Sequence, residues 1–521
     1  MSRTRRHAGW AAIVATLVAL VVLLALTSGL PSQDGRVASL RLTDTAGTRL
    51  GQGVVPLARA HAGRSGVLPL PRGTDAFAAR IALAEAAERS LDVQYYIWRA
   101  DMSGTLLFEA LHRAADRGVR VRLLLDDNNT GGLDPLLATL DTHPLIEVRL
   151  FNPFAHRGWR WLGYLTDFPR LNRRMHNKSF TADNQATVMG GRNVGDEYFD
   201  AGDGVLFVDL DVLAIGPVVD TVSQDFDRYW ASGSSYPLDG LVAQMPVSAL
   251  SDLAAAASLL ERDPAAREYV RALADMSYRD GLEDGELAVE WVPVRLISDD
   301  PAKGLGRASR ESLLSERLRE KVGIPQREMQ IVSPYFVPTT AGVDYMVRLA
   351  QQGIQVSVLT NSLEATDVTA VHAGYAKHRK TLLEAGVILY ELKRETVGVP
   401  KAPRKLAGSS ASSLHAKVFS VDRERAFIGS FNFDPRSVNL NTEMGLLVES
   451  TTIASGIADA FHDRIPGTAY RLQQGPEGRL QWVEKDAGGG DARVLDKEPG
   501  NGFWLNLAVS VMAALPIEWM L

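Results

Sequence analysis

The chain of 521 residues contains no cysteine, which excludes disulfide bonds and thiolate metal sites. It also has no excess of basic residues, since 56 Lys and Arg stand against 62 Asp and Glu, for a formal net charge of −6. A general nucleic-acid-binding protein usually carries a basic excess, so we expect no nucleic-acid partner. The hydrophobic fraction of 46% and the charged fraction of 23% are those of an ordinary globular chain, long enough for two or three domains.

The most informative feature that is present is a repeated motif. HNKSFTAD at residues 176–183 returns as HAKVFSVD at residues 415–422, and both follow the pattern HxKxxxxD. In each copy the Asp is followed, at the same spacing, by a four-residue element that ends in Asn: GGRN at 190–193 and GSFN at 429–432. A single copy would indicate only a surface hairpin with a solvated His and Lys. Two copies with matched spacing are hard to obtain by chance and indicate a shared function.

Each copy has the pattern of a β-hairpin, with β-forming residues after the His, a turn signal at the Asp and a second apolar run. Positions i and i+2 of a strand share a face, so the His and the Lys of each motif should point the same way. An imidazole, an ammonium group and an amide donor on one surface suit a phosphate oxyanion. The candidate catalytic residues are His176, Lys178, Asp183, His415, Lys417 and Asp422. The candidate phosphate-binding residues are Asn193, Ser430 and Asn432.

Two such surfaces around one phosphorus predict a two-step transfer. One imidazole attacks and forms a phosphohistidine, while the other protonates the leaving alcohol and then deprotonates the incoming one. The Lys and Asn side chains stabilise charge on the equatorial oxygens, and because these four donors supply a positive field we expect no metal and no other cofactor. Asp183 and Asp422 fall at turns, where capping competes with direct chemistry as their role, and we favour the cap.

This doublet resembles the phospholipase D superfamily, whose signature is two HxKxxxxD motifs that form one site between two similar domains. From about residue 66 onward the chain is similar to the cardiolipin synthase branch, for example in LDVQYYIWRADMSG, LNRRMHNKSF, DLDVLAIGPV, ISDDPAKG and HAGYAK. The resemblance implies transfer of a phosphatidyl group to a lipid alcohol such as phosphatidylglycerol. The alternatives are hydrolysis of the same bond, by a phospholipase D or another phosphodiesterase, and a catalytically inactive lipid-binding protein, which the two intact motifs disfavour.

The resemblance also implies individual roles. In the family the nucleophile is usually the His of the N-terminal motif, which makes His176 the nucleophile and His415 the acid and base. A later acid hydrogen-bonds a catalytic His in the family, and by position we expect Glu443 in NTE and Asp211 in DLD to orient the two imidazoles. The family often has Gly-Ser at the start of the four-residue element, whereas the first copy here reads Gly-Gly at 190–191 and lacks that hydroxyl.

Helices and strands alternate in the same order in both halves of the chain, which predicts an α/β fold of two similar α/β/α domains packed as a pseudo-two-fold pair. Strands are expected at 91–98, 119–125, 146–151, 329–337, 354–360 and 387–392, and helices at 75–89, 106–117, 345–352 and 372–385. The expected divisions are a linker at 31–65, the first domain at 66–245, a helical connection at 246–290 that we interpret as a solvated spacer, the second domain at 291–475 and a C-terminal extension at 476–521.

Residues 1–30 have the pattern of a membrane segment. Three Arg in positions 3–6 precede an uncharged apolar run from Trp10 to Leu26, near the short end of what spans a bilayer. We favour an uncleaved single-pass anchor over a cleaved signal peptide, because no convincing cleavage site follows the run. The Arg cluster favours a cytoplasmic N-terminus, so the catalytic body would lie on the outer, periplasmic side of a bacterial inner membrane.

Three further segments suggest contact with lipid. Residues 151–174 mix five Arg with six aromatic residues, which suits a headgroup interface as well as an ordinary loop over the core. Residues 503–521 are apolar with a Pro and a Glu, which suits a helix lying in the membrane interface or one packed on the domain. The basic and Ser-rich stretch 401–413, just before the second motif, is a candidate flap. The sequence names no protein partner.

Overall fold

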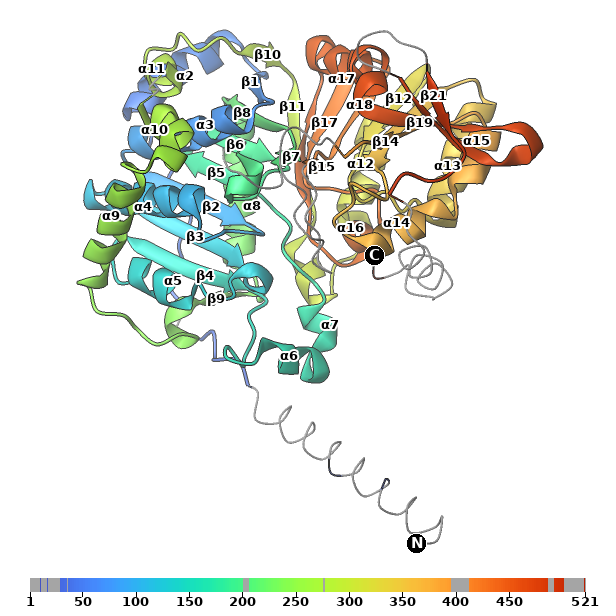
Figure 1. Cartoon of the computed structure of the whole chain (residues 1–521). Helices are drawn as coiled ribbons and strands as arrows, with labels where there is room; N and C mark the ends of the chain where they lie inside the picture. Colours follow the sequence, from blue (N-terminus) through green and yellow to red (C-terminus); the bar gives the residue numbers. More distant parts are fainter. Residues whose placement is uncertain are drawn as a thin grey trace, which may run out of the picture.

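Two β-sheets with helices on their faces lie side by side and meet along a seam (Figure 1). This arrangement confirms the expected α/β class and the duplication. The computed structural model describes residues 10, 16, 29–34, 36–199, 206–274, 277–394, 412–485, 492–500 and 520.

The first sheet has nine strands in the order β10-β1-β8-β6-β5-β2-β3-β4-β9. Parallel pairing joins β2, β3 and β4, whereas the β5–β6 hairpin and the outer strands pair antiparallel. All of β2 and nearly all of β3 are buried, although polar and apolar residues alternate along β2, so both faces of this part of the sheet are covered. The strands are β1 (Ser65–Leu70), β2 (Ser90–Tyr95), β3 (Arg120–Asp126), β4 (Ile146–Phe151), β5 (Ser179–Ala182), β6 (Ala186–Gly190), β8 (Asp211–Ile215), β9 (Ser235–Pro237) and β10 (Glu290–Val292).

The second sheet has ten strands in the order β11-β18-β17-β16-β12-β13-β14-β19-β20-β21. Its first eight positions repeat the order β1-β8-β6-β5-β2-β3-β4-β9 of the first sheet, so the whole half is duplicated and not only the motif. Strands β20 and β21 lie beyond the expected boundary at residue 475 and extend this sheet. The strands are β11 (Val294–Ser298), β12 (Glu328–Val332), β13 (Gln355–Asn361), β14 (Ile388–Leu392), β16 (Val418–Val421), β17 (Arg425–Gly429), β18 (Met444–Val448), β19 (Ala469–Gln474), β20 (Leu480–Glu484) and β21 (Arg493–Leu495).

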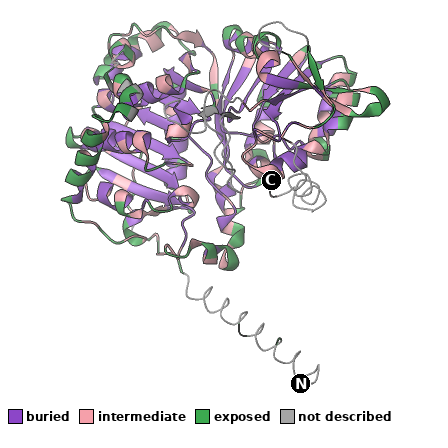
Figure 2. Cartoon of the chain, viewed as in Figure 1, coloured by how far each residue is buried: buried purple, intermediate pink, exposed green. Residues whose placement is uncertain are grey.

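Helices cover both sheets, and the strands between them are the most buried part of the molecule (Figure 2). The helices of the first half are α2 (Arg49–Ala60), α3 (Gly73–Ala86), α4 (Met102–Asp116), α5 (Asp134–Leu140), α6 (Arg160–Thr166), α7 (Phe168–Leu171), α8 (Pro217–Trp230), α9 (Ala249–Leu260), α10 (Arg267–Ala274) and α11 (Ser277–Glu283). Those of the second half are α12 (Leu314–Val322), α13 (Thr339–Gln351), α14 (Thr369–Ala376), α15 (Arg379–Glu384), α16 (Pro435–Asn439), α17 (Thr451–Asp463) and α18 (Ile465–Thr468).

The seam between the halves is itself a hydrophobic core. Met189 on β6 and Val222 on α8 belong to the same buried cluster as Met444 and Leu446 on β18 and Ala454 on α17. A short parallel pair, β7 (Leu206–Val208) with β15 (Ser412–Leu414), also joins one half to the other. Apolar packing and backbone hydrogen bonds therefore both fix the relation of the two halves.

Two expectations about connecting segments are wrong. Residues 31–65 are not only a linker, because α2 forms there with Thr48 as its N-cap and Leu50 in the core. The helix was not predicted because its sequence contains two Gly and a Pro, which are unfavourable in helices. Gly53 is required there, because a Cβ would lie 2.0 Å from a backbone oxygen of α11. The connection at 246–290 is not a solvated spacer, because α9, α10 and α11 pack on the first half, where the ring of Tyr269 lies 4.8 Å from that of Phe77.

The expected anchor within 1–30, the interfacial helix at 503–521 and the flap at 401–413 lie almost wholly outside the described residues. Within the ranges that are described, no helix combines the length and hydropathy that a bilayer crossing requires.

Candidate active site

The two motifs meet at the seam. In each, the strand of the hairpin begins directly after the motif Lys, with β5 at Ser179 and β16 at Val418. The backbone N–H of His176 donates to the carbonyl of Thr442 at 2.9 Å, and that of His415 donates to Val208 at 2.9 Å. Each catalytic His is thus fixed by a backbone bond to the opposite half of the molecule.

A carboxylate from the opposite half orients each imidazole. Nδ1 of His176 donates to Oε2 of Glu443 at 2.8 Å, and Nδ1 of His415 donates to Oδ2 of Asp209 at 2.6 Å. The carbonyl of Ser430 lies 3.1 Å from the same Nδ1 of His176. Because Nδ1 of each ring faces an acid, chemistry at phosphorus falls to Nε2.

The expectation that Asp211 orients a His is wrong, while Glu443 lies where it was expected. Asp211 instead accepts from the buried guanidinium of Arg80 at 2.8 Å. The strand register explains the error: Gly190 pairs with Asp211, whereas Gly429 pairs with Gly445. The acid that corresponds to Glu443, two residues before its paired position, is therefore Asp209 and not Asp211.

The motif aspartates are turn caps and do not face the imidazoles. Asp183 accepts hydrogen bonds from the backbone N–H groups of residues 88–90, at the start of β2. Asp422 does the same for residues 326–328, at the start of β12. Both aspartates have positive φ angles, of 51° and 55°, as Asp tolerates in tight turns. The two aspartates were predicted as candidate catalytic residues, and this prediction is corrected in favour of the capping role.

The two four-residue elements differ in what they do. Ser430 was expected to bind phosphate, but its hydroxyl donates to Glu443 and accepts from the N–H of Met444. At the matching position Gly191 has no side chain, and a Cβ there would lie 2.2 Å from Oδ1 of Asp209. The glycine therefore makes room for the orienting acid.

Each of the two asparagines has a side-chain atom that is available for a hydrogen bond to a ligand. Nδ2 of Asn193 and Oδ1 of Asn432 are buried and have no hydrogen-bond partner in the described part of the chain. Oδ1 of Asn193 accepts from the N–H of Ile97 at 3.2 Å, which fixes this amide in place. A half-turn of the Asn432 amide would present its nitrogen instead of its oxygen.

Both motif lysines are buried in the site. Lys178 and Lys417 are 1% and 2% exposed, and each ammonium donates to the carbonyl of its own motif His. Burial lowers the pKa of Lys178 well below its ordinary value and that of Lys417 to about 8, although Asp209 and Glu443 oppose the shift. Two buried ammonium groups in one site favour an anion as their partner.

The same field keeps the imidazoles neutral. Burial, and then Lys178 and Lys417, lower the pKa of His176 well below its ordinary value. Burial and Lys417 lower the pKa of His415 to about 3, despite the opposing effect of Asp209. Lys178 also lowers the pKa of His415, so the ammonium groups of both motifs lie near enough to each imidazole to act on its charge.

The two orienting acids differ in charge state. Burial would raise the pKa of Asp209, but Lys417 and His415 outweigh it and hold the pKa below the usual range. Burial raises the pKa of Glu443 to about 7, although Lys178 opposes it. Glu443 is further held by Ser437, which donates to Oε1 at 2.9 Å. Asp209 is thus the fixed anion of the pair, and Glu443 is near its midpoint at neutral pH.

Several residues of the site were not predicted. The ring of Tyr96 meets His176 edge to face at 4.9 Å, and Tyr198 meets His415 in the same way at 5.1 Å. Tyr96 follows β2 in the stretch LDVQYYIW, but nothing in the sequence distinguishes it from a core residue. Asp209 had a signal in the sequence, since it is the other acid of DLD.

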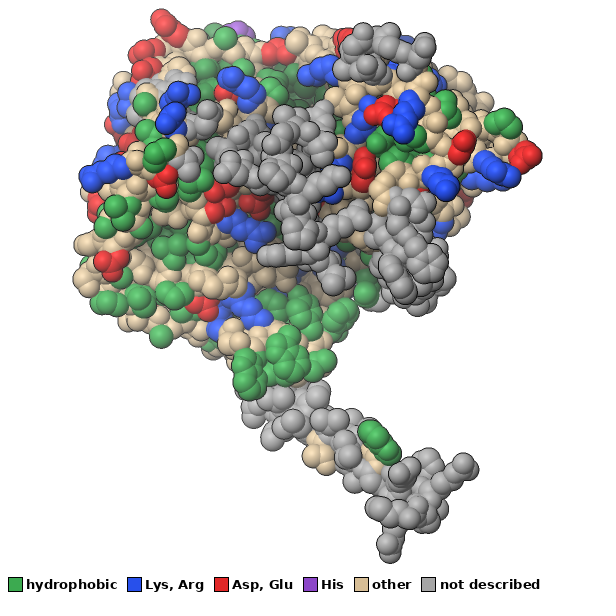
Figure 3. Space-filling model, in the orientation of Figure 1, with side chains coloured by type: hydrophobic (Ala, Val, Ile, Leu, Met, Phe, Trp, Pro, Cys, Tyr) green, Lys and Arg blue, Asp and Glu red, His purple; other side chains and the backbone are tan. Residues whose placement is uncertain are grey.

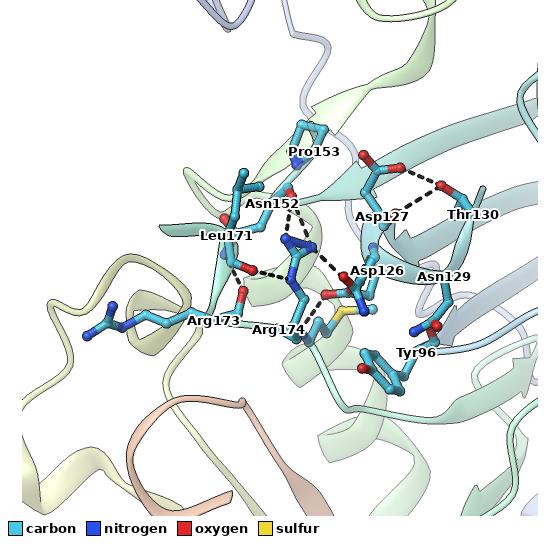
Figure 4. A network of polar contacts seen from close by, with 12 residues as sticks. Tyr96, Asp126, Asp127, Asn129, Thr130, Asn152, Pro153, Leu171, Arg173 and Arg174 are labelled. Carbon is cyan, nitrogen blue, oxygen red and sulfur yellow. Dashed lines mark hydrogen bonds and ion pairs between the residues drawn. The ribbon is translucent and has the colours of Figure 1, made fainter. Parts of the chain in front are cut away.

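A buried ion pair fixes the backbone just before the first motif (Figure 4). The guanidinium of Arg174 donates to Asp126 at 3.3 Å and to the carbonyl of Asn152 at 3.1 Å. Asp126 also accepts from the N–H of Met175 at 2.7 Å, next to His176. The pair therefore fixes the backbone from which the first catalytic His projects.

Comparison with known proteins agrees with this geometry. The family described as "Cardiolipin synthase, PLD-like domain" matches residues 81–230 and 318–465, one match in each half. Cardiolipin synthase C of Escherichia coli K12 is 52% identical over 475 residues, which cover 91% of this chain and 100% of that protein. The chain belongs to the cardiolipin synthase family of phospholipase D-like proteins.

A second protein sequence and one solved structure match this cardiolipin synthase family member at lower identity. An uncharacterized protein of Helicobacter pylori 26695 is 31% identical over 77% of this chain and 79% of its own length. The crystal structure of phosphatidylserine synthase from Haemophilus influenzae Rd KW20 has a TM-score of 0.54 at 13% identity, covering 89% of this chain and 99% of that one. The two-domain fold is therefore shared where the sequences have diverged.

Proposed function

We propose that this protein is a cardiolipin synthase, which transfers a phosphatidyl group to the hydroxyl of a second phospholipid such as phosphatidylglycerol. The observation that carries the proposal is the pair of imidazoles at one seam, each oriented by an acid of the opposite half. The 52% identity to cardiolipin synthase C supports the choice of substrate class.

In the first step Nε2 of His176 attacks phosphorus, and the bond between phosphorus and the leaving glycerol oxygen breaks. Glu443 stabilises the positive charge that develops on the ring. His415 gives its proton to the leaving alcohol. A neutral His176 is the form that attacks, which agrees with its lowered pKa. The anionic phosphodiester offsets the two lysines when it binds, and this raises the pKa of His415 toward the value that an acid needs.

In the second step His415 removes the proton from the hydroxyl of the acceptor lipid, and that oxygen attacks phosphorus. The bond between phosphorus and Nε2 of His176 breaks, which regenerates the free enzyme and releases cardiolipin. Lys178, Lys417 and the unpartnered Nδ2 of Asn193 supply the donors for the equatorial oxygens in both steps. These groups do the work for which other phosphoryl-transfer enzymes use a metal, so no metal takes part in the proposed steps.

The test is incubation of the purified protein with phosphatidylglycerol labelled in its headgroup and in its acyl chains. The proposal predicts cardiolipin and free glycerol as products, whereas phosphatidic acid and glycerol without cardiolipin would establish the hydrolase instead. A chelator should leave the rate unchanged, and strong inhibition by the chelator would contradict the metal-free steps.

For the location of the protein, the apolar run within residues 1–30 supports an uncleaved anchor in a bacterial inner membrane, with the catalytic body on the outer side. Accessibility of an introduced cysteine to a membrane-impermeant thiol reagent in intact spheroplasts tests the side, because the natural chain has no cysteine.

A further inference from the structure

A cluster of large apolar side chains is exposed around α6. Trp159, Trp161, Leu165 and Phe168 are 67%, 62%, 57% and 38% exposed, and we call these four residues the α6 surface. Figure 3 shows hydrophobic side chains gathered at this end of the molecule. Elsewhere in the described chain, exposed large apolar residues are spread over many elements. A contiguous patch of this kind marks a surface that is covered in use.

The arginines of this region do not share that surface. Arg157 pairs with Asp127 and Asp134, and Arg160 donates to the carbonyl of Asp127 at 2.8 Å. Arg170 pairs with Asp167 at 2.6 Å. The headgroup interface of mixed Arg and aromatic residues expected from the sequence is therefore corrected: these three arginines turn inward and hold the segment in place, whereas the aromatic rings of the α6 surface are exposed.

The α6 surface is directly connected to the catalytic site. Tyr164, between its members on α6, donates its hydroxyl to Asn128 at 2.7 Å, and the N–H of Asn128 donates to Asp126 at 2.9 Å. Asp126 holds the backbone of Met175, the residue before His176. An occupant of the α6 surface therefore lies against the structure that positions the first catalytic His.

The chain that follows the N-terminal apolar run contacts the same end of the first half. The side chain of Gln33 donates to the carbonyl of Ser235 at 3.0 Å. The carbonyl of the preceding residue, Ser234, accepts from the backbone N–H of Asn152. The side chain of Asn152 in turn donates to the carbonyl of Arg170 on α7. Figure 1 shows α6 and α7 at this end. The uncharged run at 10–26 thus ends only a few residues before a point fixed close to α7.

We propose that the α6 surface docks into a phospholipid bilayer, with Trp159 and Trp161 at headgroup depth and Leu165 below them. Amphipathic Trp rings favour that depth, and an apolar helix face with its cations turned inward fits a lipid surface better than an acidic partner. The inference rests on the proposed function, because it gives the lipid substrate a route to His176 from the membrane in which it resides.

The chain allows a clean test, because it contains no cysteine. The variant Leu165→Cys carries a unique site for an environment-sensitive fluorophore on the full chain. Ile324→Cys is the matched control, since Ile324 is 64% exposed and lies beside the turn capped by Asp422, at the end of β16 away from His415. Both labelled proteins are reconstituted in vesicles of phosphatidylethanolamine and phosphatidylglycerol with and without nitroxide-labelled lipid.

The proposal predicts a blue-shifted emission at residue 165 that nitroxide lipids quench several-fold, and neither effect at residue 324. Equal signals at the two positions would overturn it. A blue shift without quenching by lipid would mean that a protein surface, such as a second copy, covers α6, and would overturn it as well. The readout does not depend on turnover, so failure of the proposed chemistry and failure of the docking surface are distinguishable.

A second measurement checks the consequence for catalysis. The paired substitutions Trp159→Ser and Trp161→Ser should lower turnover of vesicle lipid several-fold, because a smaller fraction of the enzyme is docked on the bilayer through the α6 surface. Ile324→Ser should not change turnover. Unchanged turnover in the paired variant would contradict the role of the surface in substrate access.

Discussion

The carboxylate of Asp209 lies 2.6 Å from Nδ1 of His415, although 206 residues separate them and they belong to different halves of the molecule. Glu443 and His176 repeat the relationship in the opposite direction at 2.8 Å. Neither half therefore contains a complete acid–imidazole pair, and the duplication produced one site instead of two.

Asp209 and Asp211 should respond differently to the same change. Asp209→Asn removes the acceptor that fixes the tautomer of His415, so we expect activity to fall by about 10²-fold to 10⁴-fold with little effect on stability. Asp211→Asn leaves the guanidinium of Arg80 buried and poorly paired, at a cost of about 3–5 kcal/mol in the free energy of unfolding. Steady-state kinetics and denaturant unfolding of both variants separate the two roles. Equal losses of activity at equal stability would contradict the assignment.

Gly191 should not tolerate a side chain. In Gly191→Ala the new Cβ would meet Oδ1 of Asp209 at 2.2 Å and displace the carboxylate from His415. A displacement of about 1 Å in such a group costs on the order of 10²-fold in rate. The control is Gly456→Ala in α17, where a Cβ meets nothing within 4 Å, and its activity should remain unchanged. If Gly191→Ala is as active as the control, the packing of Asp209 against this glycine has no catalytic importance.

The motif aspartates should matter for stability more than for chemistry. Asp183→Ala leaves the N–H groups of residues 88–90 without their acceptor, and Asp422→Ala does the same for residues 326–328. We expect each to lower the free energy of unfolding by about 1–3 kcal/mol. The activity of the molecules that remain folded should change little. A large drop in kcat without loss of stability in either variant would restore a chemical role.

The pH dependence should show an alkaline limb that belongs to the lysines. Lys417 has a pKa of about 8, so it is charged below that pH and loses its charge above it. The quantity kcat/KM reports the free enzyme and should therefore fall as the pH rises through about 8. Lys417→Arg removes this titration, because a guanidinium stays charged, and leaves only the limb of Lys178. A profile that is flat to pH 10 would contradict the buried positions of the lysines.

Much of this account could be predicted from the sequence, because the motifs depend on local patterns. The hairpins follow from strand periodicity, and the repeated element order indicated the duplication, whereas the His and Lys of each motif lie just before the strand. The orienting acid of His415 was misassigned because DLD offers two acids, Asp209 and Asp211, and only the pairing of Gly190 with Asp211 decides between them. The inward orientation of Arg157 could not be predicted from local patterns either, since its partner Asp134 precedes it by 23 residues.

The most direct test of the central claim, that both motifs act on one phosphodiester through His176, is capture of the covalent intermediate. Protein mixed with phosphate-labelled phosphatidylglycerol is quenched under basic conditions, which preserve phosphohistidine, and the adduct is located by peptide mass spectrometry. We predict label on His176, none in His176→Ala, and loss of most turnover in both His176→Ala and His415→Ala. Label on His415, or turnover that survives either substitution, would contradict the account.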